Sequence, residues 1–441
     1  MNQKVYFYEK EREREMVDNS NLHSAKREKQ DEFYTQYEDI ETEMNAYFEY
    51  DQNVFKDKTI LLPCDDPEWS EFTRYFASNF DRFGIKKLIS TSYAPGAANK
   101  KPTLFELSSP TYNKNLNETH GKLFVLERER ERSVDIDDLK FTYLKGDGDF
   151  RSPEVCKLRD ESDIIITNPP FSLFREFLNW ILTANKKFII LGNVNAITYK
   201  EIFPLLKRNK IWIGYRSLNK DMFFRVPEDY GEYLLKNKKE GSAYKVIDGI
   251  IMGSLRNACW FTNIDLSKRH KTLQLDTKAH NLKFNKKLQK KLKEYGTKDY
   301  PKYDNYDAIE VPFVECIPSD YKGVMGVPIT FMDKYNPEQF EIVSFRKGED
   351  GKDLVFTEER EREFNHTFAS LCDGNSRTIQ QSKGYKNKWK IYLRQNHNPK
   401  KTPVDVIFPL STNLQNGLIN NCAINGKKTY VRMLIQSRER K

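Results

Sequence analysis

Short apolar runs alternate with an amphipathic helical pattern in the first half of the chain, and this alternation limits the fold more than any other feature. Residues 68–84 place Phe at helical spacing and end on Gly84, as in a helix with a glycine cap. A strand, a helix and a second strand in that order predict a parallel sheet of an α/β fold. The runs typical of buried strands are "TILLP" (59–63), "KKLIST" (86–91), "DIIIT" (163–167), "KFIILG" (187–192) and "KIWIGY" (210–215).

Two further patterns complete this half. Residues 171–182, "FSLFREFLNWIL", put Phe174, Phe177, Leu178 and Ile181 on one helical face. Residues 95–140 are polar and rich in Glu-Arg pairs, and we expect them to form an insertion over the sheet.

The chain of 441 residues is long enough for two or three domains. It has no apolar run of about 18 residues and no apolar stretch at its start, so we expect neither a membrane span nor a secretory signal. The six cysteines form no C-x-x-C pair and the six histidines do not cluster. We therefore expect a cytoplasmic protein with reduced thiols and no metal site.

Positive charge is concentrated in the C-terminal half. Residues 268–302 carry twelve Lys and Arg against three acids, a net +9, and residues 376–441 carry fourteen against two, a net +12. Because the whole chain has +9, the remaining residues are net −12. Such segregation favours a polyanionic partner, although a solvated lysine surface is the simpler alternative.

The sequence "NPPF" follows the apolar run 163–167 directly. At the carboxyl end of a parallel strand, where open sheets bind ligands, Asn168 would present an amide oxygen. Pro169 and Pro170 would form a rigid corner with acceptor carbonyls, and Phe171 would add a flat apolar face. Two acceptors and a ring suit a planar group that bears an NH₂, such as the exocyclic amine of a base. The alternative is a strand-to-helix turn in which Asn168 caps the helix.

This motif resembles the catalytic motif of S-adenosylmethionine-dependent amino-methyltransferases, and longer segments resemble the EcoRI modification methylase family of DNA adenine methyltransferases over about residues 31–355. The segments are "DEFYTQYEDIE" (31–41), "CDDP" (64–67), "GDGDFRS" (146–152), "TNPPFSLFREFL" (167–178), "GNVNAITYKEIF" (192–203), "YPKYDNYDAI" (300–309), "GVMGVPITF" (323–331) and "NPEQFE" (336–341). The resemblance implies an α/β fold with a Rossmann-like class I methyltransferase core, a predominantly parallel sheet and a C-terminal basic target-recognition region. We expect a polar tail over residues 1–30, the core over 31–270 and the recognition region over 271–441.

The resemblance also implies S-adenosylmethionine as cofactor. By position, the cofactor contacts would come from Phe33, Tyr34, Thr35, Pro63, Cys64, Asp65, Asp66, Asp149 and Phe150. Asp65 or Asp66 would meet the methionine ammonium, although an N-cap for the next helix fits them equally well. Asp149 would accept from the adenosine amine or serve as a turn residue, and Cys64 fits a small buried filler better than a nucleophile. The chain has no Gly-rich loop here, and the family that it resembles shares this departure.

A pocket for a base amine at the sheet edge requires a way to bring the base to it and residues that bind the DNA. An amine inside a stacked duplex is out of reach, so the target adenine must be flipped out. Residues 283–295 form a helical pattern with Leu288, Leu292 and Tyr295 on one face, and residues 382–397 mix basic and aromatic residues within a segment, 357–422, that does not match the family. The candidate DNA-binding residues are Lys286, Lys287, Lys290, Lys291, Lys386, Lys388, Trp389 and Lys390.

Together these features predict a site-specific DNA adenine-N6 methyltransferase, the modification component of a type II restriction–modification system. Its expected partners are double-stranded DNA and, acting on the same site, a separate cognate restriction endonuclease, and we expect a monomer. Resemblance suggests GAATTC as the recognition sequence. The alternatives are an amino-methyltransferase for cytosine N4, RNA or a protein amide, and an inactive DNA-binding relative.

Overall fold

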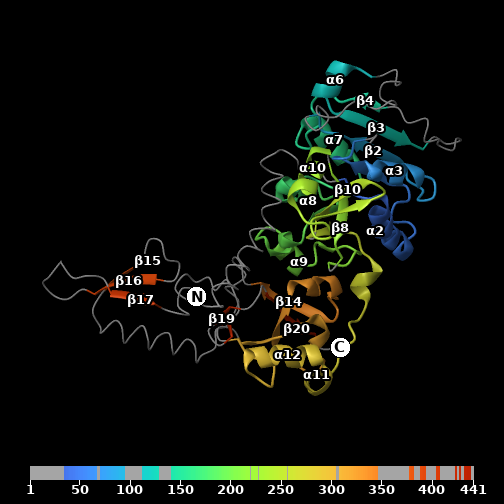
Figure 1. Cartoon of the computed structure of the whole chain (residues 1–441). Coiled ribbons are helices and arrows are strands. Elements are labelled where there is room, and N and C mark those ends of the chain that lie inside the picture. Colours follow the sequence, from blue (N-terminus) through green and yellow to red (C-terminus); the bar gives the residue numbers. More distant parts are fainter. Residues whose placement is uncertain are drawn as a thin grey trace. The chain divides into compact units, whose positions relative to one another are not determined.

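The computed structural model describes residues 34–66, 70–94, 112–128 and 141–345, apart from 219, 227, 256 and 304–306, together with short strands between residues 377 and 438. By internal contacts the chain divides into two compact units (Figure 1). Unit 1 comprises residues 1–196 and 211–267, and unit 2 comprises residues 197–210 and 268–441. The expected division of function at residue 270 stays a prediction.

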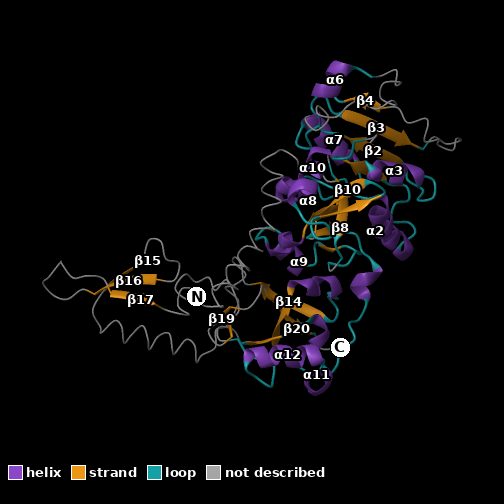
Figure 2. Cartoon of the chain, viewed as in Figure 1, coloured by secondary structure: helices purple, strands orange, loops and turns teal. Residues whose placement is uncertain are grey.

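An eight-stranded sheet in the order β4-β3-β2-β1-β5-β6-β11-β7 forms the centre of unit 1 (Figure 2). Its middle strands, β2-β1-β5-β6, are parallel, and Ile60 lies beside both Leu88 and Ile164. The strands are β1 (Thr59–Leu62), β2 (Lys87–Thr91), β3 (Lys122–Glu127), β4 (Phe141–Tyr143), β5 (Ile164–Thr167), β6 (Lys187–Asn193), β7 (Trp212–Ile213) and β11 (Ala258–Thr262).

The expectation of a predominantly parallel sheet is confirmed only in part, because the sheet is mixed. Three neighbouring pairs of this sheet are parallel, but the four pairs on its two flanks are antiparallel. The four neighbouring strands that pair parallel are separated in sequence by helices, as crossover connections require. The run expected over 210–215 contributes only the two residues of β7, at the sheet's edge.

The predicted insertion over 95–140 is also wrong in part. Its residues 122–127 form β3, which pairs antiparallel with β2 and extends the sheet. This strand alternates buried and more exposed positions, so one of its faces belongs to the core. The helix α6 (Lys114–Thr119) precedes it.

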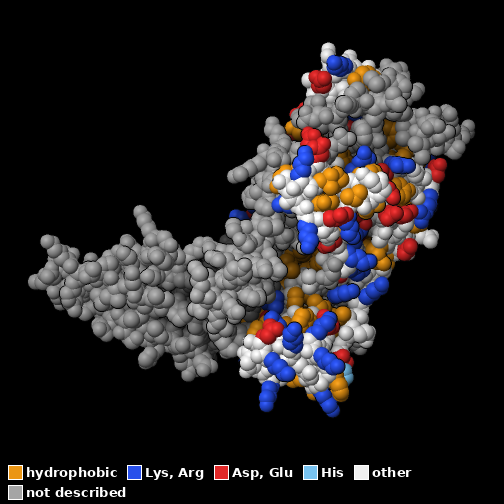
Figure 3. Space-filling model, viewed as in Figure 1, with side chains coloured by type: hydrophobic (Ala, Val, Ile, Leu, Met, Phe, Trp, Pro, Cys, Tyr) orange, Lys and Arg blue, Asp and Glu red, His pale blue; other side chains and the backbone are white. Residues whose placement is uncertain are grey.

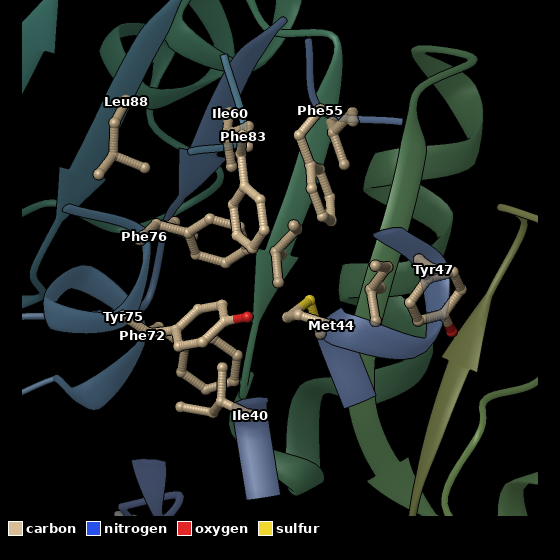
Figure 4. Packing of buried hydrophobic residues seen from close by; sticks show 14 of the residues in the cluster. Ile40, Met44, Tyr47, Phe55, Ile60, Phe72, Tyr75, Phe76, Phe83 and Leu88 are labelled. Carbon is tan, nitrogen blue, oxygen red and sulfur yellow. The ribbon is translucent and has the colours of Figure 1, made fainter. Parts of the chain in front are cut away.

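Helices cover both faces of the sheet, and its central strands β1 and β5 are therefore buried along their whole length. On one face, α2 (Tyr37–Tyr50) and α3 (Glu71–Ser78) contribute a cluster of aromatic and aliphatic side chains that point toward one another (Figure 4). On the other face lie α7 (Pro153–Glu161) and α8 (Phe174–Thr183), and the Phe174 ring is 5.1 Å from that of Phe261 in β11.

Of two helices predicted from the sequence, one is confirmed and the other is shorter than predicted. The face predicted for α8 is confirmed, since Phe174, Phe177, Leu178 and Ile181 are all buried. The helix expected over 68–84 is shorter: α3 ends at Ser78 with Asn79 as its C-cap. Gly84 instead adopts φ +66° in the turn before β2, so it is not the helix cap.

A second, antiparallel sheet of unit 1 has the order β8-β10-β9. Its strands are β8 (Met222–Arg225), β9 (Tyr244–Ile247) and β10 (Ile250–Leu255), accompanied by α10 (Glu228–Asn237). Two backbone hydrogen bonds of 3.0 Å join Arg225 of β8 to Tyr34. The segment before α2 is thereby fixed in place.

Unit 2 contains a four-stranded sheet in the order β12-β13-β20-β14. The last strand of the chain thus lies inside the sheet, between strands that come much earlier. Its elements are α9 (Phe203–Lys207), α11 (Lys278–Phe284), α12 (Lys286–Tyr295), β12 (Ala308–Glu310), β13 (Val324–Pro328), β14 (Phe340–Phe345) and β20 (Arg432–Ser437).

Between β14 and β20 the structure describes two small antiparallel sheets. β15 (Arg377–Gln381), β16 (Lys388–Leu393) and β17 (Val404–Ile407) form one, and β18 (Ala423–Ile424) and β19 (Lys427–Lys428) form the other. No helix in the described part of the chain is both long and apolar enough to cross a membrane.

Candidate active site at the carboxyl ends of β1 and β5

The strand order reverses between β1 and β5, because β2 lies on one side of β1 and β5 on the other. All three strands are parallel, so the segments after Leu62 and Thr167 leave the same edge of the sheet side by side. Open α/β sheets bind ligands at such a switch point. The segments "PCDD" (63–66) and "NPPF" (168–171), singled out in the sequence, therefore lie next to each other at this edge.

Asn168 follows β5 directly and is half-buried. Pro169 is buried, and the backbone carbonyl of Pro170 accepts a hydrogen bond of 2.9 Å from the Leu173 N–H, which closes a turn of 3₁₀ helix. The expectation that both proline carbonyls are available is therefore wrong for Pro170. Among the described residues, no backbone N–H donates to the Pro169 carbonyl.

Phe171 packs against the core and also begins a helical turn. Its ring is half-buried and packs against the main hydrophobic cluster of unit 1. The residue begins the 3₁₀ turn Phe171–Leu173, whose N-cap Pro170 makes no side-chain capping bond. The helix α8 begins only at Phe174, so the alternative in which Asn168 caps that helix is wrong.

Asp65 is almost completely buried, with 5% of its surface exposed. One carboxylate oxygen accepts from the Ser70 hydroxyl at 2.7 Å, and the other accepts from the Thr167 hydroxyl at 2.6 Å. Burial raises the pKa of Asp65 to about 7. The N-cap of α3 is Ser70, whose hydroxyl accepts from the Phe72 N–H, so Asp65 supports the cap without being the cap itself.

Asp66 forms an ion pair with Lys122 that the sequence did not predict. The Lys122 ammonium lies 3.3 Å from the Asp66 carboxylate, and the two side chains are 2% and 10% exposed. Lys122 is the first residue of β3 and also lies 5.6 Å from the centre of the Phe141 ring. Its partner is 56 positions away in the chain, and no local pattern marks this lysine among the many others.

Asp149 and Phe150 follow β4. Both carboxylate oxygens of Asp149 accept from the Arg151 guanidinium, at 2.8 and 2.6 Å. These bonds hold the pKa of Asp149 below its usual value, so the group is anionic. Phe150 is buried, and its ring packs edge-on against Phe177 at 5.0 Å.

The loops after β2 and β4 touch each other through their backbones. The Ala94 N–H donates to the Asp147 carbonyl at 2.7 Å. Gly148 has φ +82°, and a Cβ on it would lie 2.0 Å from the Ser92 carbonyl oxygen. Only glycine permits this approach, which brings the "GDGDF" segment to the same edge as the β2 loop.

The remaining predicted cofactor residues lie in the loop after β1 or precede α2. Thr35 is buried, and its hydroxyl oxygen has no hydrogen-bond partner among the described residues. The Pro63 carbonyl accepts from the Thr91 hydroxyl at 3.2 Å. Burial, together with the neighbouring Asp65 carboxylate, raises the pKa of the Cys64 thiol, which suits a filler and not a nucleophile. Phe33 lies outside the described residues.

The candidate DNA-binding residues lie in unit 2. Leu288 and Leu292 of α12 are buried, while Lys286, Lys287 and Lys290 are exposed, so the predicted amphipathic helix is confirmed. Lys291 lies 2.6 Å from Glu294. Lys388, Trp389 and Lys390 are consecutive positions of β16, and Lys386 lies outside the described residues. No group of three His, Cys, Asp or Glu side chains suited to a metal ion occurs in the described ranges.

Comparison with known proteins gives one family. The family model described as adenine-specific methyltransferase EcoRI matches residues 21–438. The chain is 45% identical over 336 residues to the type II methyltransferase M.EcoRI of Escherichia coli, which covers 76% of this chain and 92% of that protein. It is 34% identical over 323 residues to the type II methyltransferase M.MpnI of Mycoplasma pneumoniae, covering 72% and 83%. No solved structure gave a significant match.

Proposed function

The chain belongs to the adenine-specific methyltransferase EcoRI family, and from this premise we propose that the corner Asn168–Phe171 binds the target adenine of a DNA site and directs methyl transfer to its N6. The enzyme is an adenine-specific DNA methyltransferase of the type II restriction–modification class. The observation that carries the proposal is the place of "NPPF" directly after β5, beside the β1 loop at the switch point of the sheet.

The residues of the corner explain how an amine becomes a nucleophile. The N6 lone pair of adenine is delocalised into the ring, which makes the nitrogen unreactive. In our proposal the Asn168 amide oxygen and the Pro169 carbonyl accept its two N–H bonds, which favours a pyramidal nitrogen with a localised lone pair. Phe171 stacks on the base. The alkylated nitrogen is acidic, so a strong general base is unnecessary.

The residues present fit S-adenosylmethionine, which supplies the electrophilic methyl group when bound. The Thr35 hydroxyl is a buried polar group without a described partner, which a ligand would satisfy. Asp66, whose carboxylate pairs with Lys122, would meet the ammonium of the methionine moiety. Tyr34, Pro63, Cys64, Asp149 and Phe150 would form the rest of the site, and Phe33 would precede it.

DNA contacts would come from the basic surface of unit 2. Lysine and arginine side chains gather around α11 and α12 (Figure 3). Burial of Leu288 and Leu292 turns the lysines of α12 outward, where phosphates can reach them. Residues 386–390 would add contacts from the basic C-terminal segment. Flipping the adenine costs a few kcal/mol, which these contacts would offset.

We further propose a cytoplasmic monomer that modifies GAATTC and protects it from a cognate restriction endonuclease. The site and the endonuclease follow from family resemblance alone, and sequencing of methylated DNA from expressing cells would test the site.

The decisive variant is Asn168→Ala, with Asn179→Ala, an exposed asparagine on α8, as its matched control. Asn168→Ala should lose methyl transfer by at least about 1,000-fold in single-turnover assays, since the acceptor acts on the reacting nitrogen. Its affinities for cofactor and DNA should change less than about threefold, and Asn179→Ala should behave as wild type.

A wild-type rate for Asn168→Ala would overturn the mechanism. Mass spectrometry of the product separates the other substrates, because cytosine-N4, RNA or protein methylation would appear as different products. Binding of S-adenosylmethionine and DNA by wild type without any methylated product would identify an inactive relative.

A further inference from the structure

The buried carboxylate of Asp65 joins three segments that meet beneath the candidate active site. Its oxygens accept from Ser70 at the start of α3 and from Thr167 at the end of β5. Its backbone is held by β2: the Asp65 N–H donates to the Thr91 carbonyl at 3.0 Å, and the Ser90 hydroxyl donates to the Asp65 carbonyl. The loop after β1 is therefore fixed to both neighbouring strands through one residue.

We propose that Asp65 is a positioning residue for methyl transfer: its carboxylate fixes the end of β5, and with it Asn168, relative to the β1 loop, and it does not bind the cofactor. This inference rests on the proposed role of Asn168. It separates Asp65 from Asp66, which the sequence could not distinguish as contacts of the methionine ammonium.

The hydrogen bonds of Asp65 explain why it is a poor cofactor ligand. Both of its oxygens already accept from side chains of the protein, at 2.7 and 2.6 Å, and only 5% of the residue is exposed. The carboxylate keeps further lone pairs, but at this burial a ligand ammonium would have to move Ser70, the N-cap of α3, or Thr167 to reach them. Such a displacement would leave a buried hydroxyl unsatisfied.

The position of Thr167 explains why this contact matters for catalysis. The pairing of β5 with β6 ends at Thr167, opposite Ile190, so the sheet's ladder stops one residue before Asn168. The bond from the Thr167 hydroxyl to Asp65 adds a connection to β1 at that boundary. Because a misplacement of about 1 Å can cost roughly 100-fold in rate, a looser strand end should slow the reaction.

The burial of Asp65 predicts a pH dependence. Cys64 and Asp66 flank it on the β1 loop, Lys122 of β3 pairs with Asp66, and Asp149 lies on the loop after β4. Ser70 at the N-cap of α3 and Thr167 of β5 contribute hydroxyls. Since burial raises the pKa of Asp65 to about 7, protonation below that pH would remove one acceptor and loosen the contact.

The test combines Asp65→Asn, Thr167→Val and their double variant in the full-length enzyme. Each single variant should lose about 10- to 100-fold in single-turnover methylation, while the dissociation constant for S-adenosylmethionine, measured by calorimetry without DNA, stays within about threefold of wild type. The double variant should be no slower than the slower single variant, because both remove one contact. Thr167→Ser, which keeps the hydroxyl, should recover most of the rate.

The pH profile gives a readout that loss of packing would not reproduce. The wild-type single-turnover rate should fall as pH drops through about 7, and Asp65→Asn should lack this acid limb. Two control variants remove similar groups elsewhere: Thr262→Val, a buried β11 hydroxyl that donates to Phe188, and Asp163→Asn at the opposite end of β5. Both should keep the wild-type rate and its pH profile.

Two results would overturn the proposal. If Asp65→Asn weakened cofactor binding more than about tenfold while Thr167→Val were normal, Asp65 would be a cofactor ligand. Wild-type rates for both single variants would show that the contact does not position the site. Neither result depends on Asn168→Ala, whose failure to impair methylation would instead reject the proposed function.

Discussion

At the scale of single residues, Phe171 is expected to both stack on the adenine and pack in the core. Loss of a base–aromatic stack costs about 1–3 kcal/mol, so Phe171→Ala should cut single-turnover methylation by about 10- to 100-fold. Phe171→Trp should keep most of the activity, because it retains a flat ring. Since Phe171 packs against the hydrophobic cluster, Phe171→Ala should also lower the thermal midpoint of unfolding.

A mismatch opposite the target adenine separates these two roles. Flipping costs less from a mismatch, so the rate defect of Phe171→Ala should shrink on a mismatched duplex if the ring stabilises the flipped base. A defect of equal size on both duplexes would assign the ring to packing alone.

Asp65 should also make the stability of the protein depend on pH. Its pKa rises from 3.8 in the unfolded chain to about 7 in the folded protein, so the folded state binds the proton more tightly. The resulting stabilisation is fully present below about pH 4 and is lost as pH rises through about 7. A shift of about three units corresponds to a few kcal/mol. Urea unfolding from pH 5 to 8 should show wild type losing stability relative to Asp65→Asn, and parallel curves would contradict this.

At this scale, sequence reasoning could place residues that are neighbours in the chain. The four residues of the corner are consecutive, so their place after a buried strand could be read directly. The contacts of Asp65 with Thr167 and of Asp66 with Lys122 join residues 102 and 56 positions apart. Only the order of strands in the sheet brings such partners together, and a single sequence does not display that order.

At the scale of elements, the parallel centre of the sheet was predictable because its strands are short, apolar and separated by helices. The strand β3 was missed because Glu-Arg-rich sequence surrounds it and only one of its faces is buried. The helix α3 was predicted too long because Phe80 and Phe83 continue its spacing. Both are buried, but in the turn that follows the helix.

The contact between the β2 and β4 loops yields an element-scale prediction. Gly148→Ala would force a side chain into φ +82° with its Cβ 2.0 Å from a backbone oxygen. It should lower the free energy of unfolding by about 2 kcal/mol or more and weaken cofactor binding, because the loops must separate. Gly146→Ala is the matched control, since its Cβ would meet nothing within 4 Å. Equal stability of the two variants, measured by urea unfolding, would refute the role of this approach.

At the scale of the whole molecule, the chain's last strand completes the sheet of unit 2. β20 pairs with β13 and β14, and the Arg432 guanidinium is bound by the buried Glu310 of β12 at 2.6 Å. In the sequence, β14 and β20 are separated by residues 346–431, yet they pair side by side. The family model matches residues 21–438 and therefore extends across the segment 357–422, which the resemblance had left unmatched.

The segregation of charge leads to a prediction about DNA affinity. Each phosphate contact contributes about −0.9 to the slope of log K against log salt. Changing Lys286, Lys287 and Lys290 to Gln should therefore make the slope shallower by about 2 to 3, while cofactor affinity stays unchanged. The control changes three exposed lysines of unit 1, Lys157, Lys236 and Lys239, and removes the same formal charge. Affinity for a duplex is measured between about 50 and 200 mM salt. Equal changes in both triple variants would mean that net charge alone attracts DNA, and no change in either would mean that α12 does not face the phosphates.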